Sequence, residues 1–437
     1  YLGDLAQEMG LLTPADLADR IAQSIAAVLG NQASNGAFGL WSPGTGDLWL
    51  DAYATDFLSR ARAQGYAVPE TGFRAAMDNL RNQINYAQDF DSGGAGIAYA
   101  LHVLARESAA QMGDLRYYAD VKGDAFDSPL AAAQLGAALA AYGDPTRADA
   151  MFARAARMIA AHESTAEPRG WRDDYGTRLR DSAGVLALAV EAGSNAVDAA
   201  DLVGQVAMGI ADGAARSTQE RVWALMAAQA LRADDAQLGI TVDGLPAGGV
   251  PAQVMDDLRA TAGPPLVITN TSDQDIPLAL TLFGVPDVPE PAGGTNYTIE
   301  RHYFTPEGDP ITPENIAAGA RMVAVLTIDP WEARRARLLI EDPLPAGFEI
   351  DNPNLLRAGD ISALGWLELA QNVSHAEFRA DRFIAALEWG DERPFRLAYI
   401  LRAVTPGEFH HPAASVQDLY RPENRAWTDA GRVSIGP

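Results

Sequence analysis

The segment Phe395–Glu423, FRLAYILRAVTPGEFHHPAASVQDLYRPE, predicts a strand, a tight turn and an anchored tail. Apolar residues at every second position from Phe395 to Leu401 are typical of a strand with at least one buried face. Thr405–Gly407 predicts a turn, because proline presets φ and glycine permits positive φ. The amphipathic stretch Val416–Tyr420 follows and forms the tail.

The composition limits the class of protein. The chain has 437 residues, 48% hydrophobic and 21% charged, which indicates a globular protein of roughly two or three domains. Its net charge of −25, without a basic block, argues against nucleic acid and anionic membrane surfaces as partners. The lack of cysteine excludes disulfides, thiolate metal sites and a cysteine nucleophile in this chain. No apolar run is long enough to span a bilayer, and the start at Tyr1 suggests a C-terminal fragment of a longer protein.

Residues 1–233 have the pattern of roughly nine helices joined by short loops. Thr13-Pro14 with Asp16 predicts a helix start with a capping box. Further starts are indicated by Ser128-Pro129, Asp144-Pro145 and the pair Ser217 and Glu220. Alanine-rich stretches favour helix and allow helices to approach closely.

Two glycine–aromatic loops form a weak internal repeat. Gly36–Trp41 precedes a helix that we expect to begin near Trp49, and Gly170–Tyr175 precedes one that begins near Gly176. A loop of this kind suits an α/α toroid of paired helices, because the aromatic ring fills the wide end of the barrel and glycine permits close approach.

Near Ala233 the helical pattern gives way to proline, glycine, threonine and β-branched residues. A small β unit is expected over 234–290, and 286–294 has the composition of a linker. Alternation and turn signals then predict an antiparallel β-sandwich over 291–437. The expected strands cover 238–245, 266–272, 277–283, 297–303, 322–328, 338–340, 383–389 and 395–404.

Several acidic residues near helix starts permit two interpretations. As a sugar site they would supply a general acid and a general base. We favour helix capping and complementation of the helix dipole, because helix starts attract aspartate. The residues are Asp51, Asp56, Asp173, Asp174, Asp181 and, beside them, Tyr175.

The remaining candidate ligands are weaker. Asp89–Gly96 has neither P-loop nor calcium-loop spacing and is interpreted as a loop before the helix 97–106. His102 in that helix has no evident partner, which favours a structural role. His410 and His411 would point to opposite faces of a strand, which argues against a shared metal. We therefore predict no metal and no cofactor.

The C-terminal segment resembles the end of the last macroglobulin domain in the bacterial alpha-2-macroglobulin family. The family pattern is Y-x-x-R-A-V-T-P-G-x-F followed by P-A-x-x-V/A-x-D/E-M-Y-x-P. It is matched by Tyr399, Arg402, Ala403, Val404, Thr405, Pro406, Gly407, Phe409, Pro412, Ala413, Val416, Asp418, Tyr420 and Pro422. Leu419 stands where the family usually has methionine. NGAFGLW at 35–41, residues 49–69 and QERVWALMAAQAL at 219–231 resemble the thioester domain of the same family.

The resemblance implies a multidomain α plus β fold. Residues 1–233 would form a thioester-type α/α toroid that lacks its first helices. Residues 234–290 would be the second part of a CUB-like β unit, and 291–437 the terminal macroglobulin β-sandwich. The family's thioester motif, Cys-x-Glu-Gln, would lie upstream of this chain.

The resemblance also implies a function. Members trap endopeptidases in the periplasm as a bacterial defence: bait cleavage exposes a thioester, which acylates a lysine of the attacking peptidase. Leu419 and Tyr420 occupy the positions that shield the thioester, and the chain itself would not be an enzyme. Implied partners are target endopeptidases and a cell-wall synthase of the penicillin-binding class. The full-length protein would be a monomer with a lipid anchor at the inner membrane.

Two other functions stay open at this point. A carbohydrate-active enzyme, a lyase or glycosidase, also combines an α/α toroid with a β-sandwich, and predicts a deep acidic cleft in the toroid. A scaffold module without a thioester would act only through surface contacts and predicts no reaction with amines.

Overall fold

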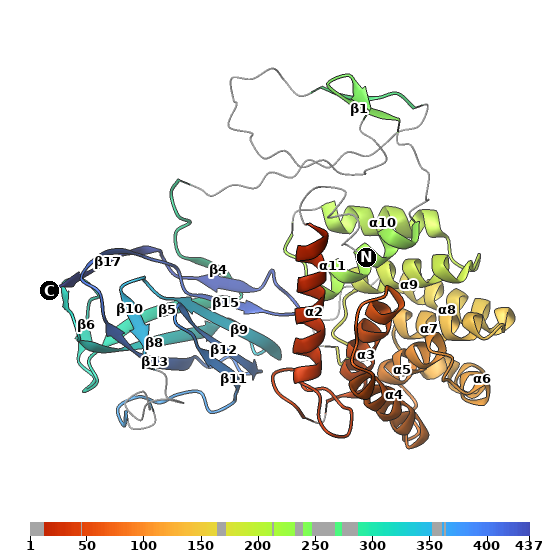
Figure 1. Cartoon of the computed structure of the whole chain (residues 1–437), viewed down its shortest axis with the longest axis horizontal. Coiled ribbons are helices and arrows are strands. Elements are labelled where there is room, and N and C mark those ends of the chain that lie inside the picture. Colours follow the sequence, from red (N-terminus) through yellow and green to blue (C-terminus); the bar gives the residue numbers. More distant parts are fainter. Residues whose placement is uncertain are drawn as a thin grey trace. The chain divides into compact units, whose positions relative to one another are not determined.

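The computed structural model describes residues 13–44, 46–163, 172–211, 214–231, 239–246, 267–272, 287–351, 361 and 364–437. Contacts divide these residues into two compact units (Figure 1). The helical unit contains the described residues of 13–163, 176–211 and 219–272. The C-terminal unit contains 172–175, 214–218 and the described residues from 287 onward. The predicted combination of helices with antiparallel sheets is confirmed.

The helical unit alternates inner and outer helices. The described residues form α2 Pro14–Gly30, α3 Leu48–Ala63, α4 Glu70–Asn85, α5 Ala95–Arg106, α6 Met112–Asp120, α7 Pro129–Ala141, α8 Pro145–Glu163, α9 Arg178–Ala192, α10 Ala199–Ala211 and α11 Thr218–Leu231. Helices α3, α5, α7 and α9 are the most buried, and each packs against the next in that order. Helices α4, α6, α8 and α10 pack against this inner row. The alternation is that of an α/α toroid.

Local sequence signals explain several helix starts. Thr13 and Asp16 exchange the two hydrogen bonds of the predicted capping box at α2. The Ser128 hydroxyl accepts a 3.2 Å hydrogen bond from the Ala131 N–H, and Pro129 takes the first position of α7. Within the described part of the chain, none of the helices is both long and apolar enough to cross a bilayer.

Alanine and glycine let the inner helices pack closely. Ala131, Ala132 and Ala133 in α7 are almost completely buried. A Cβ added at Gly136 would lie 3.2 Å from the Ala148 carbonyl oxygen and from the Phe152 ring. Small residues in α7 therefore set how near α8 can come.

The C-terminal unit is built on two large antiparallel sheets. One has the order β10-β13-β8-β5-β6 and the other β11-β12-β9-β15-β16-β4, while β14-β17-β7 form a third, smaller sheet. The bounds are β4 Gly293–Thr295, β5 Tyr297–Phe304, β6 Pro310–Ile311, β7 Ile316–Ala317, β8 Arg321–Pro330, β9 Ala336–Pro343, β10 Phe348–Ile350, β11 Val373–Phe378, β12 Arg382–Trp389, β13 Phe395–Ala403, β14 Gly407–His411, β15 Ser415–Asp418, β16 Arg425–Trp427 and β17 Gly431–Gly436.

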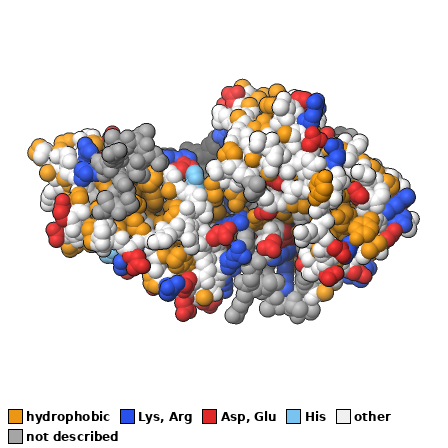
Figure 2. All heavy atoms as spheres, turned by 90° about the horizontal axis from the view of Figure 1, so that it is seen from below, with side chains coloured by type: hydrophobic (Ala, Val, Ile, Leu, Met, Phe, Trp, Pro, Cys, Tyr) orange, Lys and Arg blue, Asp and Glu red, His pale blue; other side chains and the backbone are white. Residues whose placement is uncertain are grey.

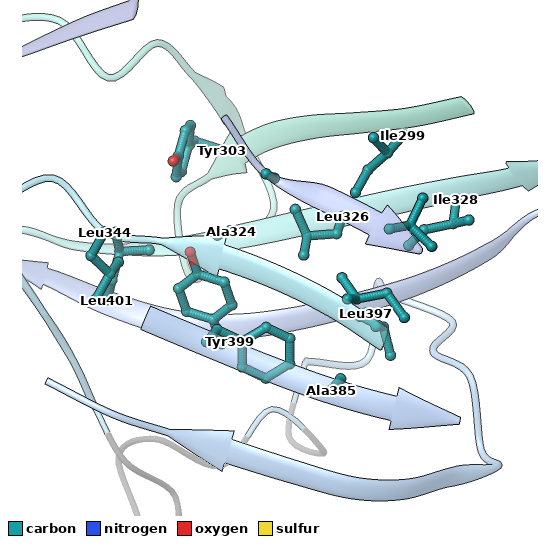
Figure 3. Close-up of a cluster of buried hydrophobic side chains, with 14 of the residues drawn as sticks. Ile299, Tyr303, Ala324, Leu326, Ile328, Leu344, Ala385, Leu397, Tyr399 and Leu401 are labelled. Atoms are coloured by element: carbon teal, nitrogen blue, oxygen red, sulfur yellow. The ribbon is translucent and has the colours of Figure 1, made fainter. Parts of the chain in front are cut away.

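The core of the sandwich lies between the two large sheets. Leu326, Leu397 and Tyr399 gather there with Ala385 (Figure 3). The Tyr399 ring stacks on the Phe383 ring with centroids 4.8 Å apart. β13 buries both of its faces, because its alternate residues pack against a second apolar cluster. β13 lies between β10 and β8 in its sheet, and burial of both faces goes beyond the one buried face that the alternation required.

The small predicted β unit is only partly described. β1 Ile240–Val242 pairs antiparallel with β2 Leu245–Pro246 and with β3 Ile268–Asn270. The strand predicted at 277–283 lies outside the described residues. The predicted boundaries of the domains at 233 and 290 stay predictions.

Charges of both signs are mixed at the surface. On the face shown in Figure 2, Lys and Arg side chains lie among Asp and Glu side chains. Many of the described arginines form ion pairs with nearby carboxylates, as Arg147 does with Asp120 at 2.8 Å.

Candidate functional site

The turn that carries Leu419 and Tyr420 is fixed by its own backbone and side chains. Asp418, only 1% exposed, accepts a 3.1 Å hydrogen bond from the Tyr420 N–H and a 2.8 Å one from Arg421 Nε. The Leu419 N–H donates to the carbonyl oxygen of Arg337 at 2.9 Å. The bonds to Asp418 hold the turn together, and the Leu419–Arg337 bond ties it to the start of β9. Burial raises the pKa of Asp418, and the Arg421 charge opposes that rise.

The ring of Tyr420 meets Tyr175, a residue of the same unit. Their ring centroids are 5.0 Å apart, with the planes inclined by 38°. The guanidinium carbon of Arg337 lies 4.7 Å from the centroid of the Tyr175 ring, a cation–π distance. Burial acts to lower the pKa of Arg337, but hydrogen bonds with Tyr175, Glu388 and Tyr420 raise it overall. We call Tyr175, Arg337 and Tyr420 the tyrosine–arginine cluster.

Sequence reasoning found only part of this cluster. It singled out Tyr420 through the family pattern and Tyr175 through a possible sugar site. Arg337 carried no signal, because an arginine in an alternating strand is typical of a solvent-facing position. Only the pairing of β9 with β15 places Arg337 beside the turn.

The helical unit has a separate pocket of about 380 Å³. Its lining includes Asp56 and Arg60 from α3, Tyr99 from α5 and Trp223 from α11. Arg60 Nε lies 2.9 Å from Asp56 Oδ1, and the Tyr99 hydroxyl donates to Asp56 Oδ2 at 3.0 Å. Asp56 is therefore paired with a cation and held in its charged form; burial would raise its pKa, but the nearby arginines lower it overall.

The other acidic candidates have structural partners. The prediction that Asp51 caps α3 is wrong, because Asp47 is the N-cap residue and Asp51 lies in the first turn. Asp51 instead accepts hydrogen bonds from the Phe38 N–H at 2.7 Å, from Asn79 at 2.8 Å and from Gln83 at 2.7 Å. It thus fixes the first glycine–aromatic loop.

The remaining candidates do not meet Asp56 in the pocket. Asp174 pairs with Arg172 at 2.7 Å, and Asp181 pairs with Arg180 at 2.9 Å. Of the residues considered for a sugar site, only Asp56 is among those that line the pocket. The pocket therefore does not bring together two of the carboxylates that a glycosidase mechanism requires.

The two histidines of interest are buried in different units. Burial lowers the pKa of His102 to about 3, and its ring nitrogens have no hydrogen-bond partner among the described residues. His411 is buried while His410 is exposed, as expected for neighbours on a strand. His411 Nε2 lies 2.8 Å from the Tyr303 hydroxyl, and burial lowers its pKa to about 3. The described residues contain no group of three potential metal ligands.

The loop predicted at 89–96 precedes α5, but α5 begins at Ala95, two residues before the expected helix start at 97. Asp89 forms an ion pair with Lys122, and Ser92 donates to Asp127 at 3.0 Å. These contacts fasten the loop to a neighbouring segment.

Comparison with known proteins identifies the family. Residues 297–423 match the model of the Bacterial Alpha-2-macroglobulin MG10 domain. Alpha-2-macroglobulin of Escherichia coli K12 is 31% identical over 425 residues, which cover 92% of this chain and 25% of the relative. The chain belongs to the bacterial alpha-2-macroglobulin family. Alpha-2-macroglobulin of Xylella fastidiosa Temecula1 is 28% identical over 460 residues, covering 97% of this chain and 27% of the relative. The chain thus spans about a quarter of the length of these curated relatives.

Solved alpha-2-macroglobulin structures share the fold. Salmonella alpha-2-macroglobulin reacted with methylamine matches with a TM-score of 0.78 and 27% identity, over 99% of this chain and 28% of that one. Native Escherichia coli alpha-2-macroglobulin, spanning domain MG7 to the C-terminus, matches with a TM-score of 0.77 and 25% identity. That match covers all of this chain and 71% of the other. The segment matched by the MG10 model includes both Leu419 and Tyr420.

Proposed function

We propose that this chain works as part of a bacterial alpha-2-macroglobulin that traps endopeptidases. The observation that carries the proposal is the match to the Escherichia coli alpha-2-macroglobulin over 92% of the chain. In this proposal, a peptidase cleaves a bait segment outside the chain. The resulting conformational change exposes an activated acyl group, also outside the chain, to the attacking enzyme.

The proposed covalent step is an aminolysis. A lysine Nζ of the peptidase attacks the carbonyl carbon of a Cys–Gln thioester, so that a C–N bond forms as the C–S bond breaks. The sulfur leaves as a thiolate and takes up the proton that the amine loses. Because this chain has no cysteine, the thioester must be contributed by sequence outside it.

The role proposed for this chain is to keep water and stray amines from the acyl group until the bait is cut. Leu419 and Tyr420 are the shielding residues, since an apolar side chain and an aromatic ring exclude water from a reactive ester. Leucine in place of the family's methionine keeps the volume and apolarity. The bonds from Asp418 and Arg337 that fix this turn support such a role.

We infer that the chain is not itself an enzyme. The pocket in the helical unit contains one candidate carboxylate, and that carboxylate is paired with Arg60. The proposal further includes a periplasmic location, a lipid anchor at the inner membrane, a monomeric state and a cell-wall synthase as a second partner. These parts rest on the family resemblance.

The test is the intact mass of the full-length protein before and after incubation with methylamine. We expect a gain of one methylamine and the appearance of one titratable thiol. Tyr420→Ala should increase the rate of incorporation about tenfold, because removing a ring that excludes water exposes the acyl carbon. Tyr86→Ala removes a tyrosine that is 84% exposed and serves as the matched control.

The two alternatives give other results. An unmodified mass with no new thiol would contradict the thioester mechanism and favour a scaffold that acts through contacts. Turnover of a glycan by the purified protein would instead support the carbohydrate-active enzyme.

A further inference from the structure

Tyr175 has an unusual backbone conformation for a tyrosine. Its φ is +54°, in the left-handed region, although its side chain is only 4% exposed. An aromatic residue in this region is destabilised by about 1 kcal/mol or more relative to its ordinary conformations. Contacts of its side chain offset part of this strain. Two of these contacts are with the ring of Tyr420 and the guanidinium of Arg337.

Arg337 contacts the shielding turn in two ways. Its backbone carbonyl oxygen accepts the hydrogen bond from the Leu419 N–H at 2.9 Å. Its side chain lies against the Tyr175 ring and forms hydrogen bonds with Tyr175 and Tyr420. One residue thus holds both the backbone and the aromatic ring of the turn.

The ion pair with Glu388 does not explain why an arginine is needed at this position. Arg337 Nε lies 2.9 Å from Glu388, but Arg335 also reaches Glu388, at 3.4 Å. The side chain of Arg337 is 17% exposed, whereas that of Arg335 is 62% exposed. Both arginines reach Glu388, so what distinguishes the less exposed Arg337 is its contact with the two tyrosines.

We propose that Arg337 is a positioning residue that holds Tyr420 in its shielding position by clamping it against Tyr175. The inference rests on the proposed function and adds how the shield is kept closed. The ring contact of Tyr420 with Tyr175 and the hydrogen bond of Arg337 with Tyr420 exist only while Tyr420 is seated, so they stabilise the closed turn over any open one. The left-handed Tyr175 can return to an ordinary φ once Tyr420 leaves, which favours release after the first contacts break.

The experiment measures the rate of methylamine incorporation into the intact full-length protein before any peptidase is added. Arg337→Ala should raise this rate about tenfold, because it removes a partly buried cation–π contact and its hydrogen bonds. Arg337→Lys keeps the positive charge but loses the planar guanidinium with its several N–H donors, and should raise the rate about threefold. Arg335→Ala is the control, because Arg335 lies two residues away and pairs with the same Glu388. It should leave the rate within about a factor of 1.5.

Substitutions of Tyr175 are a second test of the tyrosine–arginine cluster. Tyr175→Phe keeps the ring contact with Tyr420 and loses the hydroxyl, so its rate should lie between that of the unchanged protein and that of Tyr175→Ala. The melting temperature of each variant is measured in parallel. Where Arg337→Ala does not fold, the conservative variants Arg337→Lys and Tyr175→Phe decide the question.

The outcomes separate the two proposals. If the unchanged protein takes up methylamine and the folded Arg337 and Tyr175 variants do so at the same rate, the clamp is overturned while the proposed function stands. If the unchanged protein takes up no methylamine even after peptidase treatment, the proposed function fails and the clamp fails with it. Faster uptake in these variants, with uptake by Arg335→Ala unchanged, supports the clamp.

Discussion

Two fully buried aspartates, one in each unit, are stabilised in different ways. Asp51 in the helical unit accepts hydrogen bonds from one backbone N–H and from the side-chain amides of Asn79 and Gln83. Asp342 in the sandwich instead pairs with Arg301 at 2.5 Å and accepts a 2.8 Å hydrogen bond from the Tyr399 hydroxyl. Burial raises the pKa of both carboxyls, and their hydrogen-bonding partners oppose the rise.

Each aspartate helps to fix a backbone segment of its own unit. Asp51 binds the backbone of Phe38 and so fixes the first glycine–aromatic loop. Arg301, the partner of Asp342, also donates to the carbonyl oxygen of Pro412 at 2.9 Å, in the segment that leads to β15 and Tyr420. Asp51 is thus held by neutral hydrogen-bond donors, whereas Asp342 is held by the positive charge of Arg301. Removing Asp342 would leave that arginine buried without a counter-ion, which destabilises the sandwich.

The largest effect should come from breaking the buried ion pair. Asp342→Ala should lower the free energy of unfolding by about 3–5 kcal/mol, because it leaves the Arg301 guanidinium buried without its counter-ion. Urea unfolding followed by tryptophan fluorescence measures the loss. The double variant Asp342→Ala with Arg301→Met should be more stable than the single one. A loss below about 1 kcal/mol in the single variant would contradict this account.

A smaller effect should come from Asp51. Asp51→Ala should cost about 2–3 kcal/mol, because three donors lose their acceptor but no charge is left unpaired. Asp47→Ala is the control, since an exposed N-cap typically contributes about 1 kcal/mol. Hydrogen exchange at the Phe38 amide should quicken in the Asp51 variant alone, and equal exchange in both variants would show that Asp51 does not hold the loop.

The smallest effect, per unit of pH, should come from His411 in the sandwich. His411, beside Arg301, has a pKa of about 3 when folded, below the 6.5 of an unperturbed histidine. The unfolded state therefore binds the proton first, so stability is complete above about pH 6.5 and falls by about 1 kcal/mol per unit as the pH drops toward 3.

The measurement is the pH dependence of hydrogen exchange in β5 and β8. His411→Gln should flatten it, and His410→Gln, at the exposed neighbour, should not. The slope at the Phe38 amide should be the same in both variants, because Phe38 and Asp51 lie in the helical unit and the donors to Asp51 include neither histidine. An unchanged slope in the sandwich of His411→Gln would contradict the interpretation.

Much of the fold could be predicted because its signals are local. The capping box at Thr13, the proline after Ser128 and the alternation in Phe395–Ala403 each depend on residues close together in sequence, and the structure contains all three. The role of Asp51 could not be read this way. Its partners Asn79 and Gln83 lie on the next helix, and no pattern around Asp51 distinguishes a loop anchor from a helix cap.

Residue patterns along the chain predict the periodicity of the helices and strands, and the C-terminal pattern indicates the family and the position of Leu419 and Tyr420. Which buried polar groups meet depends on the fold: Asp51 with the Phe38 loop, Arg301 with Asp342, and Arg337 with the two tyrosines. The reason is physical. Secondary structure follows from contacts between near neighbours in the chain, whereas a buried charge or a clamped ring depends on partners that only strand pairing and helix packing bring within a few ångströms.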